Sequence, residues 1–166
     1  WDLAGNQGES ITIPNIRYDA TKPQFLSVTP DSGDHVNLNT ISFELSERFA
    51  EATLLWRYIG GKQDSVEVHE MALTESNLKM GIHTSVPDST PPYLVDGALY
   101  NFLRWGRDFS GNLSDTVLVT YITYDTTAPV VEIILPRPAD AVKNAAVTYI
   151  ASEPLSSAEI IWSEVV

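Results

Sequence analysis

The sequence predicts an all-β sandwich, and three observations carry that prediction. Apolar and polar residues alternate over short runs, which is the two-residue period of half-buried strands. Turn residues separate these runs at short intervals, and no run has the length and period of an amphipathic α-helix. The third observation is an internal repeat, because residues 1–60 align without a gap on residues 107–166 with 15 identities in 60 positions.

The repeat divides the chain into three parts. Its offset of 106 residues matches a whole domain rather than a solenoid repeat. The predicted parts are the C-terminal strand or strands of a preceding repeat (1–19), one complete repeat (20–125) and the N-terminal strands of a following repeat (126–166). We expect the parent protein to be a tandem array. The chain has no initiating Met and no signal peptide, so we expect a mature or excised piece of that array.

The first strands of the complete repeat follow from alternation. Residues 41–45 alternate apolar and polar side chains, and residues 147–151 repeat that pattern. Residues 52–56 alternate next, and Gly60-Gly61 predicts a hairpin turn after them. A further strand is expected over residues 66–70.

The second half of the repeat contains the remaining elements. Thr74 is a candidate N-cap for one helical turn that ends before Gly81. The other expected elements are a strand at 82–86, a Pro-rich loop at 87–92, a long strand at 100–106 and a last strand at 117–124. About seven short strands with regular turns are typical of an immunoglobulin-like sandwich.

Two details favour this fold. Leu94, Gly97 and Tyr100 have the spacing of a tyrosine corner, in which the Tyr hydroxyl bonds back to the backbone. The last strand changes phase near residue 120, which predicts a bulge on an edge strand, and Pro14 occupies the matching position of the earlier copy.

The alternation also predicts which side chains form the core. The expected core residues are Phe43, Leu45, Trp56, Tyr100 and Phe102. Residues 1–19 and 126–166 are too short to bury an apolar face of their own, so Ile160, Ile161 and Trp162 should be exposed.

The motifs at the end of the repeat resemble a known family. Asp108-Phe-Ser-Gly-Asn112, followed by Tyr124-Asp-Thr-Thr-Ala-Pro129, is similar to the bacterial immunoglobulin-like repeats of very large surface and secreted proteins. Leu94-Val-Asp-Gly-Ala-Leu-Tyr100 fits the same family and is similar to fibronectin type III domains. The resemblance covers essentially the whole chain and implies an extracellular or cell-surface location. Arg104 departs from it, since the family keeps an apolar residue there, so either Arg104 lies at the rim of the core or the register shifts.

Composition excludes several functional classes. The net charge of -12 disfavours nucleic acid and anionic membrane surfaces as partners, and no apolar run is long enough for membrane insertion. Cys is absent, and the three His residues are scattered, so thiolate or His-based metal sites and catalytic triads are not expected. Glycoside hydrolysis needs a pair of carboxyl groups, one of which has a pKa raised by apolar surroundings so that it can act as the general acid. The two candidate pairs in this sequence lack such surroundings. These pairs are Glu67 with Glu70 and Asp31 with Asp34. The sequence therefore predicts no enzyme.

Three functions remain, all of them non-catalytic. The first is a spacer or stalk segment of a bacterial surface adhesin or extracellular fibre, whose partners are the neighbouring repeats of the same chain. The second is a carbohydrate-binding accessory module of a secreted enzyme, with Tyr58, Tyr93 and Trp105 as candidate aromatics for surface glycans or proteins. The third is the subunit of a homopolymeric extracellular filament, in which other copies of the chain are partners.

Calcium is the one cofactor that the sequence suggests. In an immunoglobulin-like sandwich, the B–C and F–G loops lie at the pole where the chain enters, so acidic and amide side chains from three segments should meet there. These are Asp19, Glu47, Asp108 and Asn112, and the set begins again with Asp125 and Glu153. Ca²⁺ prefers six to eight such oxygens, and the arrangement is similar to cadherin-type linkers. The alternative interpretation is that these residues form turns and bind no metal. We expect Asp34 and Asp96 at the opposite pole, within reach of Asp125.

Overall fold

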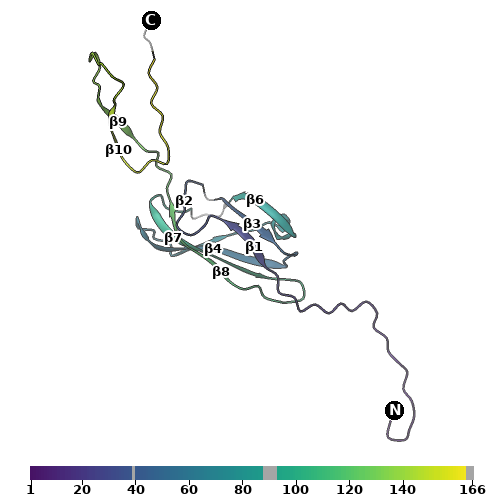
Figure 1. Ribbon diagram of the computed structural model, residues 1–166. Coiled ribbons are helices and arrows are strands. Elements are labelled where there is room, and N and C mark those ends of the chain that lie inside the picture. Colours follow the sequence, from purple (N-terminus) through teal and green to yellow (C-terminus); the bar gives the residue numbers. More distant parts are fainter. Residues whose placement is uncertain (39, 88–92, 164–166) are drawn as a thin grey trace.

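The computed structural model describes residues 1–38, 40–87 and 93–163, so most of the predicted Pro-rich loop lies outside the described residues. Ten strands and one short 3₁₀ turn follow one another in this part of the chain (Figure 1). The strands are β1 (Phe25–Thr29), β2 (His35–Val36), β3 (Thr40–Leu45), β4 (Glu51–Gly61), β5 (Val68–Met71), β6 (Gly81–Pro87), β7 (Ala98–Arg107), β8 (Val117–Tyr124), β9 (Val131–Leu135) and β10 (Thr148–Ala151). The 3₁₀ turn, Glu75–Leu78, follows Thr74, whose backbone N–H donates to the side chain of Asn77.

Strands β1 to β8 form two sheets with a shared core. One sheet has the order β1-β3-β6 and the other has the order β2-β8-β7-β4-β5. Their buried apolar side chains form a single cluster that draws on both sheets. These features confirm an all-β, sandwich-like fold, and residues 20–125 are called the central sandwich below.

The predicted core residues lie inside the central sandwich. Phe43, Leu45, Trp56, Tyr100 and Phe102 are all at most 1% exposed. The Trp56 ring lies 4.5 Å from that of Phe102 and 6.4 Å from that of Tyr100, centroid to centroid. The alternation in β3 and β7 therefore identified the inner face of each sheet correctly.

Arg104 is a buried cation on the same inner face. It pairs with Leu54 without a break in the β4–β7 register, so of the two alternatives that the sequence left open, the structure does not show a register shift against β4. Its guanidinium lies over the rings of Phe25 and Phe102, with Cζ 5.6 and 5.8 Å from their centroids. Burial lowers the pKa of Arg104 to about 10, so the group stays charged at neutral pH. Its Nε and Nη1 have no hydrogen-bond partner among the described residues.

The predicted turn at Gly60-Gly61 is wrong. Both glycines belong to β4 and pair with Leu99 and Ala98, after an irregularity in register between Tyr58 and Gly60. Gly61 has φ +75°, and a Cβ there would lie 2.5 Å from the carbonyl oxygen of Gly97. Gly61 therefore allows close backbone approach inside the sheet, and the chain turns after it.

The bulge near residue 120 is present, but not on a free edge. The β7–β8 register shifts between Tyr100 and Phe102, and Tyr121 opposite them has φ 60°. The short strand β2, which the sequence did not predict, pairs in parallel with the end of β8 and covers its other side. The tyrosine corner is also confirmed, since the backbone N–H of Val95 donates to the Tyr100 hydroxyl at 2.9 Å.

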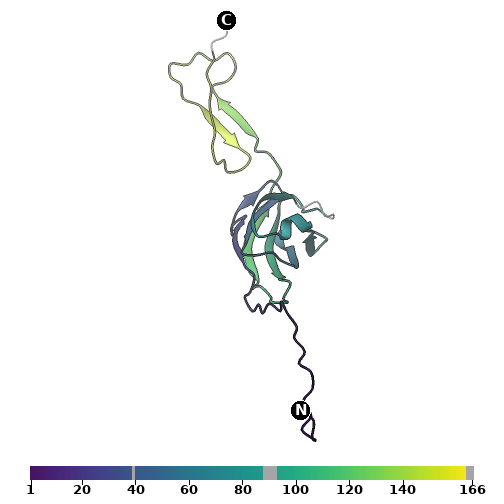
Figure 2. The same ribbon diagram turned by 90° about the vertical axis from the view of Figure 1, so that its right-hand side faces the viewer.

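The two flanking segments extend from opposite ends of the central sandwich (Figures 1 and 2). Residues 1–19, the N-terminal segment, are extended and contain no strand. Residues 126–166, the C-terminal segment, contain the antiparallel pair β9–β10. Ile160, Ile161 and Trp162 are exposed, as the sequence predicted.

Local hydrogen bonds recur at the offset of the sequence repeat. The pair Gln24 and Ser46, which closes the start of β1 on the end of β3, has its counterpart in Val130 and Ser152. The Asp34 carboxylate accepts from Asp31 N–H, as that of Asp140 accepts from Arg137 N–H, each at 2.8 Å. The flanking segments thus have the local conformations of the central sandwich without its core.

Candidate metal centre

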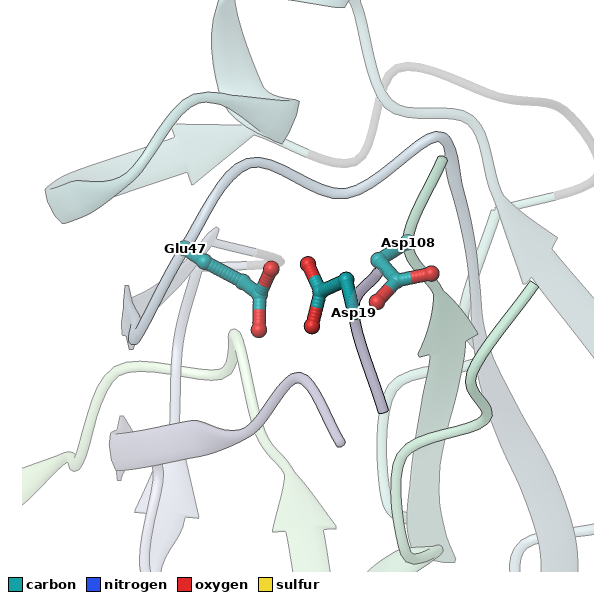
Figure 3. Close-up of side chains that lie close together, drawn as sticks. All are labelled: Asp19, Glu47 and Asp108. Atoms are coloured by element: carbon teal, nitrogen blue, oxygen red, sulfur yellow. The ribbon is translucent and has the colours of Figure 1, made fainter. Parts of the chain in front are cut away.

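Three carboxylates meet at the pole where the N-terminal segment enters the central sandwich. Asp19, Glu47 and Asp108 each offer an oxygen, and these oxygens lie within 4.8 Å of one another. Asp19 precedes β1, Glu47 lies between β3 and β4, and Asp108 follows β7, so only the fold brings them together. Figure 3 shows the three side chains converging from these separate segments. The predicted convergence of three segments is therefore present in the structure.

Asp108 organises the turn that follows β7. Its Oδ1 accepts hydrogen bonds from the backbone N–H groups of Ser110 and Asn112, and its Oδ2 accepts from Asn112 Nδ2. Burial would raise the pKa of Asp108, but the hydrogen bonds from Asn112, Ser110 and Gly111 together hold it below its usual value. Asn112 Nδ2 also donates to the Asp19 carbonyl oxygen at 3.1 Å, which fixes the turn to the incoming chain.

The same turn forms at the start of the chain, away from any sandwich. Asp2 Oδ1 accepts from the N–H groups of Ala4 and Asn6, and Asn6 Nδ2 donates to Asp2 Oδ2 at 2.8 Å. The turn is therefore formed by its own local hydrogen bonds, without contact to a sandwich. This observation supports the interpretation that Asp108 and Asn112 form a turn. It does not explain the position of Glu47.

Glu47 is not explained by turn formation. No hydrogen bond to its carboxylate occurs within the described ranges, and burial, followed by the charges of Asp19 and Asp108, raises its pKa. Arg17 offsets this only weakly, because its guanidinium is 4.0 Å from Asp19 and its side chain is 90% exposed. The cluster thus gathers negative charge that the described residues do not neutralise.

The donor set has the chemistry of a hard-cation site. All three side chains offer carboxylate oxygens, with no nitrogen or sulfur, which suits Ca²⁺ better than transition metals. A cation there would be held by Asp19, Glu47 and Asp108. Its positive charge would offset the repulsion among the three carboxylates.

Asp125 and Glu153 occupy the corresponding place at the other pole. They line a cavity of about 790 Å³ between the central sandwich and the C-terminal segment, together with Val36, Pro129 and Leu155. Asp125 Oδ1 accepts from Thr127 N–H, as Asp19 Oδ1 accepts from Thr21 N–H. His35 lines the same cavity, but among the described residues no group of three acidic or His side chains converges there as Asp19, Glu47 and Asp108 do.

Asp34 and Asp96, the two other acidic residues expected near Asp125, make different contacts. The Asp34 carboxylate caps its own turn through Asp31. The Asp96 carboxylate reaches the chain after Asp125, where it accepts from the backbone and hydroxyl of Thr126 and from the hydroxyl of Thr127. These bonds lower the pKa of Asp96.

The candidate aromatics for sugar binding do not share one surface. Tyr58 lies opposite Tyr100 on the inner face of its sheet and packs against the core. Trp105 lies opposite Thr53 on the outer face and is half-buried, whereas Tyr93 is exposed on a loop. No flat platform of two or three aromatics results from these three residues.

Sequence reasoning missed a buried polar network at the far end of the core. The Asp64 carboxylate accepts from the Tyr100 hydroxyl at 2.6 Å and from Val66 N–H at 2.8 Å, and it lies 2.7 Å from His69 Nε2. Burial would raise the pKa of Asp64, but the hydrogen bonds from Tyr100, Val66 and His69 lower it overall. The signal in the sequence was weak, because Asp64 sits in a polar stretch and a lone His has no partner that spacing can identify.

Comparison with known proteins adds no further identification. No family model, curated protein or solved structure matches the chain. No helix with the length and hydrophobicity of a membrane span occurs in the described ranges.

Proposed function

We propose that the chain is a non-catalytic spacer segment from a tandem array of immunoglobulin-like sandwiches, part of a bacterial surface adhesin or extracellular fibre. Its work is mechanical: sandwiches in series set the reach of the array, and the linkers between them set its stiffness. The observation that carries the proposal is the attachment of the linker after β8 to the central sandwich by Asp96.

Strand order supports the immunoglobulin-like assignment. The sheet β1-β3-β6 corresponds to strands A, B and E, and the sheet β2-β8-β7-β4-β5 corresponds to A′, G, F, C and C′. Trp56 on β4 is buried at the position where such domains bury a Trp on strand C. The hydrogen bonds that recur 106 residues apart support the tandem arrangement.

The linker is short and held at several points. Asp125 N–H donates to the Val36 carbonyl oxygen at 2.9 Å, and three bonds to Asp96 hold Thr126 and Thr127. Pro129 then restricts the backbone before β9. A linker fixed in this way supports a directed, stiff junction rather than a free hinge.

Substitution of Asp96 by Ala tests this function. We expect Asp96→Ala to free residues 126 and 127, so that the β9–β10 pair reorients independently of the central sandwich, while the melting temperature changes little because Asp96 is only half-buried and lies outside the core cluster. The measurement is ¹⁵N relaxation of the full chain, with small-angle scattering for its dimensions. The matched control is Asp115→Ala, which removes an exposed carboxylate that forms an ion pair with Lys22. Unchanged relaxation in Asp96→Ala would contradict the stiff-junction function.

A second candidate function is calcium binding at the pole that contains Asp19, Glu47 and Asp108. The specific observation in its favour is Glu47, whose carboxylate adds charge to the cluster without a hydrogen-bonding role in the described residues. A bound cation would join the preceding segment to two loops of the central sandwich and would stiffen that junction. Stability would then rise with calcium according to RT ln(1 + [Ca]/Kd).

The variant Glu47→Gln separates the two interpretations of this cluster. In chelator we expect it to be more stable than the parent chain by about 0.5 kcal/mol, because like-charge repulsion is removed. That gain should be present at neutral pH and vanish on acidification, since the raised pKa of Glu47 means that its proton is taken up more readily in the folded state. In millimolar calcium the order should reverse, and the parent chain should be the more stable of the two. Thermal melts in both buffers give the answer, and identical melts of the parent chain with and without calcium would leave only the turn interpretation.

A further inference from the structure

The turn before β7 contains a chemically reactive dipeptide. Asp96 and Gly97 form the only Asp-Gly sequence in the chain, and Asn-Gly does not occur. Because Gly has no Cβ, its backbone nitrogen can approach the side chain of a preceding Asp with little hindrance. Gly97 is exposed at this turn and has φ +80°. Asp96-Gly97 is therefore the place in the chain where an aspartyl side chain can most easily react with its own backbone.

The reaction is the formation and hydrolysis of a succinimide. The backbone nitrogen of Gly97 bonds to Cγ of Asp96, and the carboxyl hydroxyl leaves with the amide hydrogen as one water molecule. Water then opens the five-membered ring. Cleavage of the bond from nitrogen to Cγ restores Asp96, whereas cleavage of the bond to the main-chain carbonyl carbon gives isoaspartate. The water that is lost in the first step is regained in the second, so the mass of the chain does not change.

The closed linker blocks the carboxyl group. The Asp96 carboxylate accepts from the backbone N–H of Thr126 at 2.6 Å and from the hydroxyls of Thr126 and Thr127 at 2.8 and 2.9 Å. These bonds, led by the one from the Thr126 backbone, stabilise the ionised carboxylate and lower its pKa. An ionised carboxylate resists attack by a nucleophile, because the attack would add electron density to a group that is already negative.

The attacking nitrogen is blocked from the same side. Gly97 N–H donates to the carbonyl oxygen of Tyr124 at 2.7 Å, so the nitrogen is held against the end of β8. Tyr124 is the last residue of β8, directly before the linker. All the restraints on the two reacting groups thus come from residues 124–127, and release of this one stretch frees both groups together.

We propose that Asp96-Gly97 is a site of isoaspartate formation that the linker gates. The site is silent while residues 124–127 lie against it, and it reacts when they detach. In the product, Cγ of Asp96 belongs to the main chain, so the carboxylate that held Thr126 and Thr127 is lost. A reversible opening of the junction thereby becomes a permanent one. The inference rests on the attachment of the linker that the proposed function uses.

Incubation of the full chain at neutral pH, below its melting transition, tests the gating. The test variant is the double substitution Thr126→Ala and Thr127→Ala, which removes two of the three donors to Asp96 from exposed positions. We expect isoaspartate at residue 96 to accumulate about fivefold faster or more in this variant than in the parent chain, because fewer bonds hold the linker closed. Proteolytic digestion followed by electron-transfer fragmentation distinguishes isoaspartate from aspartate. The parent chain unfolded in urea gives the rate of the unrestrained dipeptide.

The matched control is the double substitution Thr21→Ala and Thr116→Ala. Both threonines are exposed and lie before β1 and before β8, away from the linker, so this variant should react like the parent chain. Thermal melts will show that both variants retain the central sandwich. Equal rates in the parent chain and the two variants overturn the proposal. Absence of isoaspartate from the folded test variant, when the urea-unfolded chain forms it, overturns it as well.

The consequence of the modification has its own readout. The isoaspartate form can be separated from the parent chain, and its ¹⁵N relaxation should show residues 126 and 127 freed, as in Asp96→Ala. Relaxation that is unchanged by the modification overturns the claim that the opening becomes permanent. The gating is judged from rates of a covalent change, whereas the stiff-junction function is judged from relaxation of Asp96→Ala. Failure of one proposal can therefore be distinguished from failure of the other.

Discussion

Truncation of Trp56 to Ala is expected to destabilise the central sandwich by about 3–5 kcal/mol, the cost typical of a buried large aromatic. Trp56 has no exposed surface, and it packs on Phe102 and Tyr100 from the neighbouring strand. Its removal would leave a cavity between two sheets whose backbones are held by hydrogen bonds and cannot collapse freely. Urea denaturation of the full chain measures the change.

Trp105→Ala is the matched control for Trp56→Ala. Trp105 lies on the outer face of the same sheet and is only half-buried, so its truncation should cost much less. Equal effects of the two substitutions, or a change below about 1 kcal/mol for Trp56→Ala, would contradict the assignment of the inner face.

The fold could be predicted largely because its signals are local. Alternation in residues 41–45 and 100–106 fixed which side chains face inward, and one such pattern fixes the orientation of a whole strand. The tyrosine corner and the bulge near residue 120 also have short sequence signatures, and both are present. The candidate metal centre followed from topology, since the loops of a sandwich gather at its poles.

The features that were missed depend on contacts between distant segments. The two-residue strand β2 has no pattern of its own and exists because β8 offers an open side. Gly60-Gly61 looks like a turn in sequence, yet the close approach of Gly97 makes it part of a strand. Arg104 was recognised as unusual, but its burial between Phe25 and Phe102 could not be read from residues around it.

The buried network around Asp64 provides the other large expected effect. Its carboxylate joins Tyr100 on β7, His69 on β5 and the backbone of Val66, so it ties together the end of the sandwich opposite to the acidic cluster. Substitution by Ala would leave the Tyr100 hydroxyl and the His69 ring without this acceptor in the core. We expect Asp64→Ala to cost about 3 kcal/mol or more at neutral pH.

The pH dependence of stability distinguishes this role of Asp64 from simple packing. Because the pKa of Asp64 is lower in the folded state than in the unfolded chain, where it is about 3.9, its contribution is complete above that value and is lost as the pH falls through the folded pKa. The stability difference between the parent chain and Asp64→Asn should therefore shrink steadily on acidification below about pH 4. A double-mutant cycle with Tyr100→Phe should show coupling of about 1 kcal/mol or more, since both groups share one short hydrogen bond. Denaturant unfolding between neutral and acidic pH measures both quantities. A pH-independent difference with no coupling would mean that Asp64 acts only by filling space.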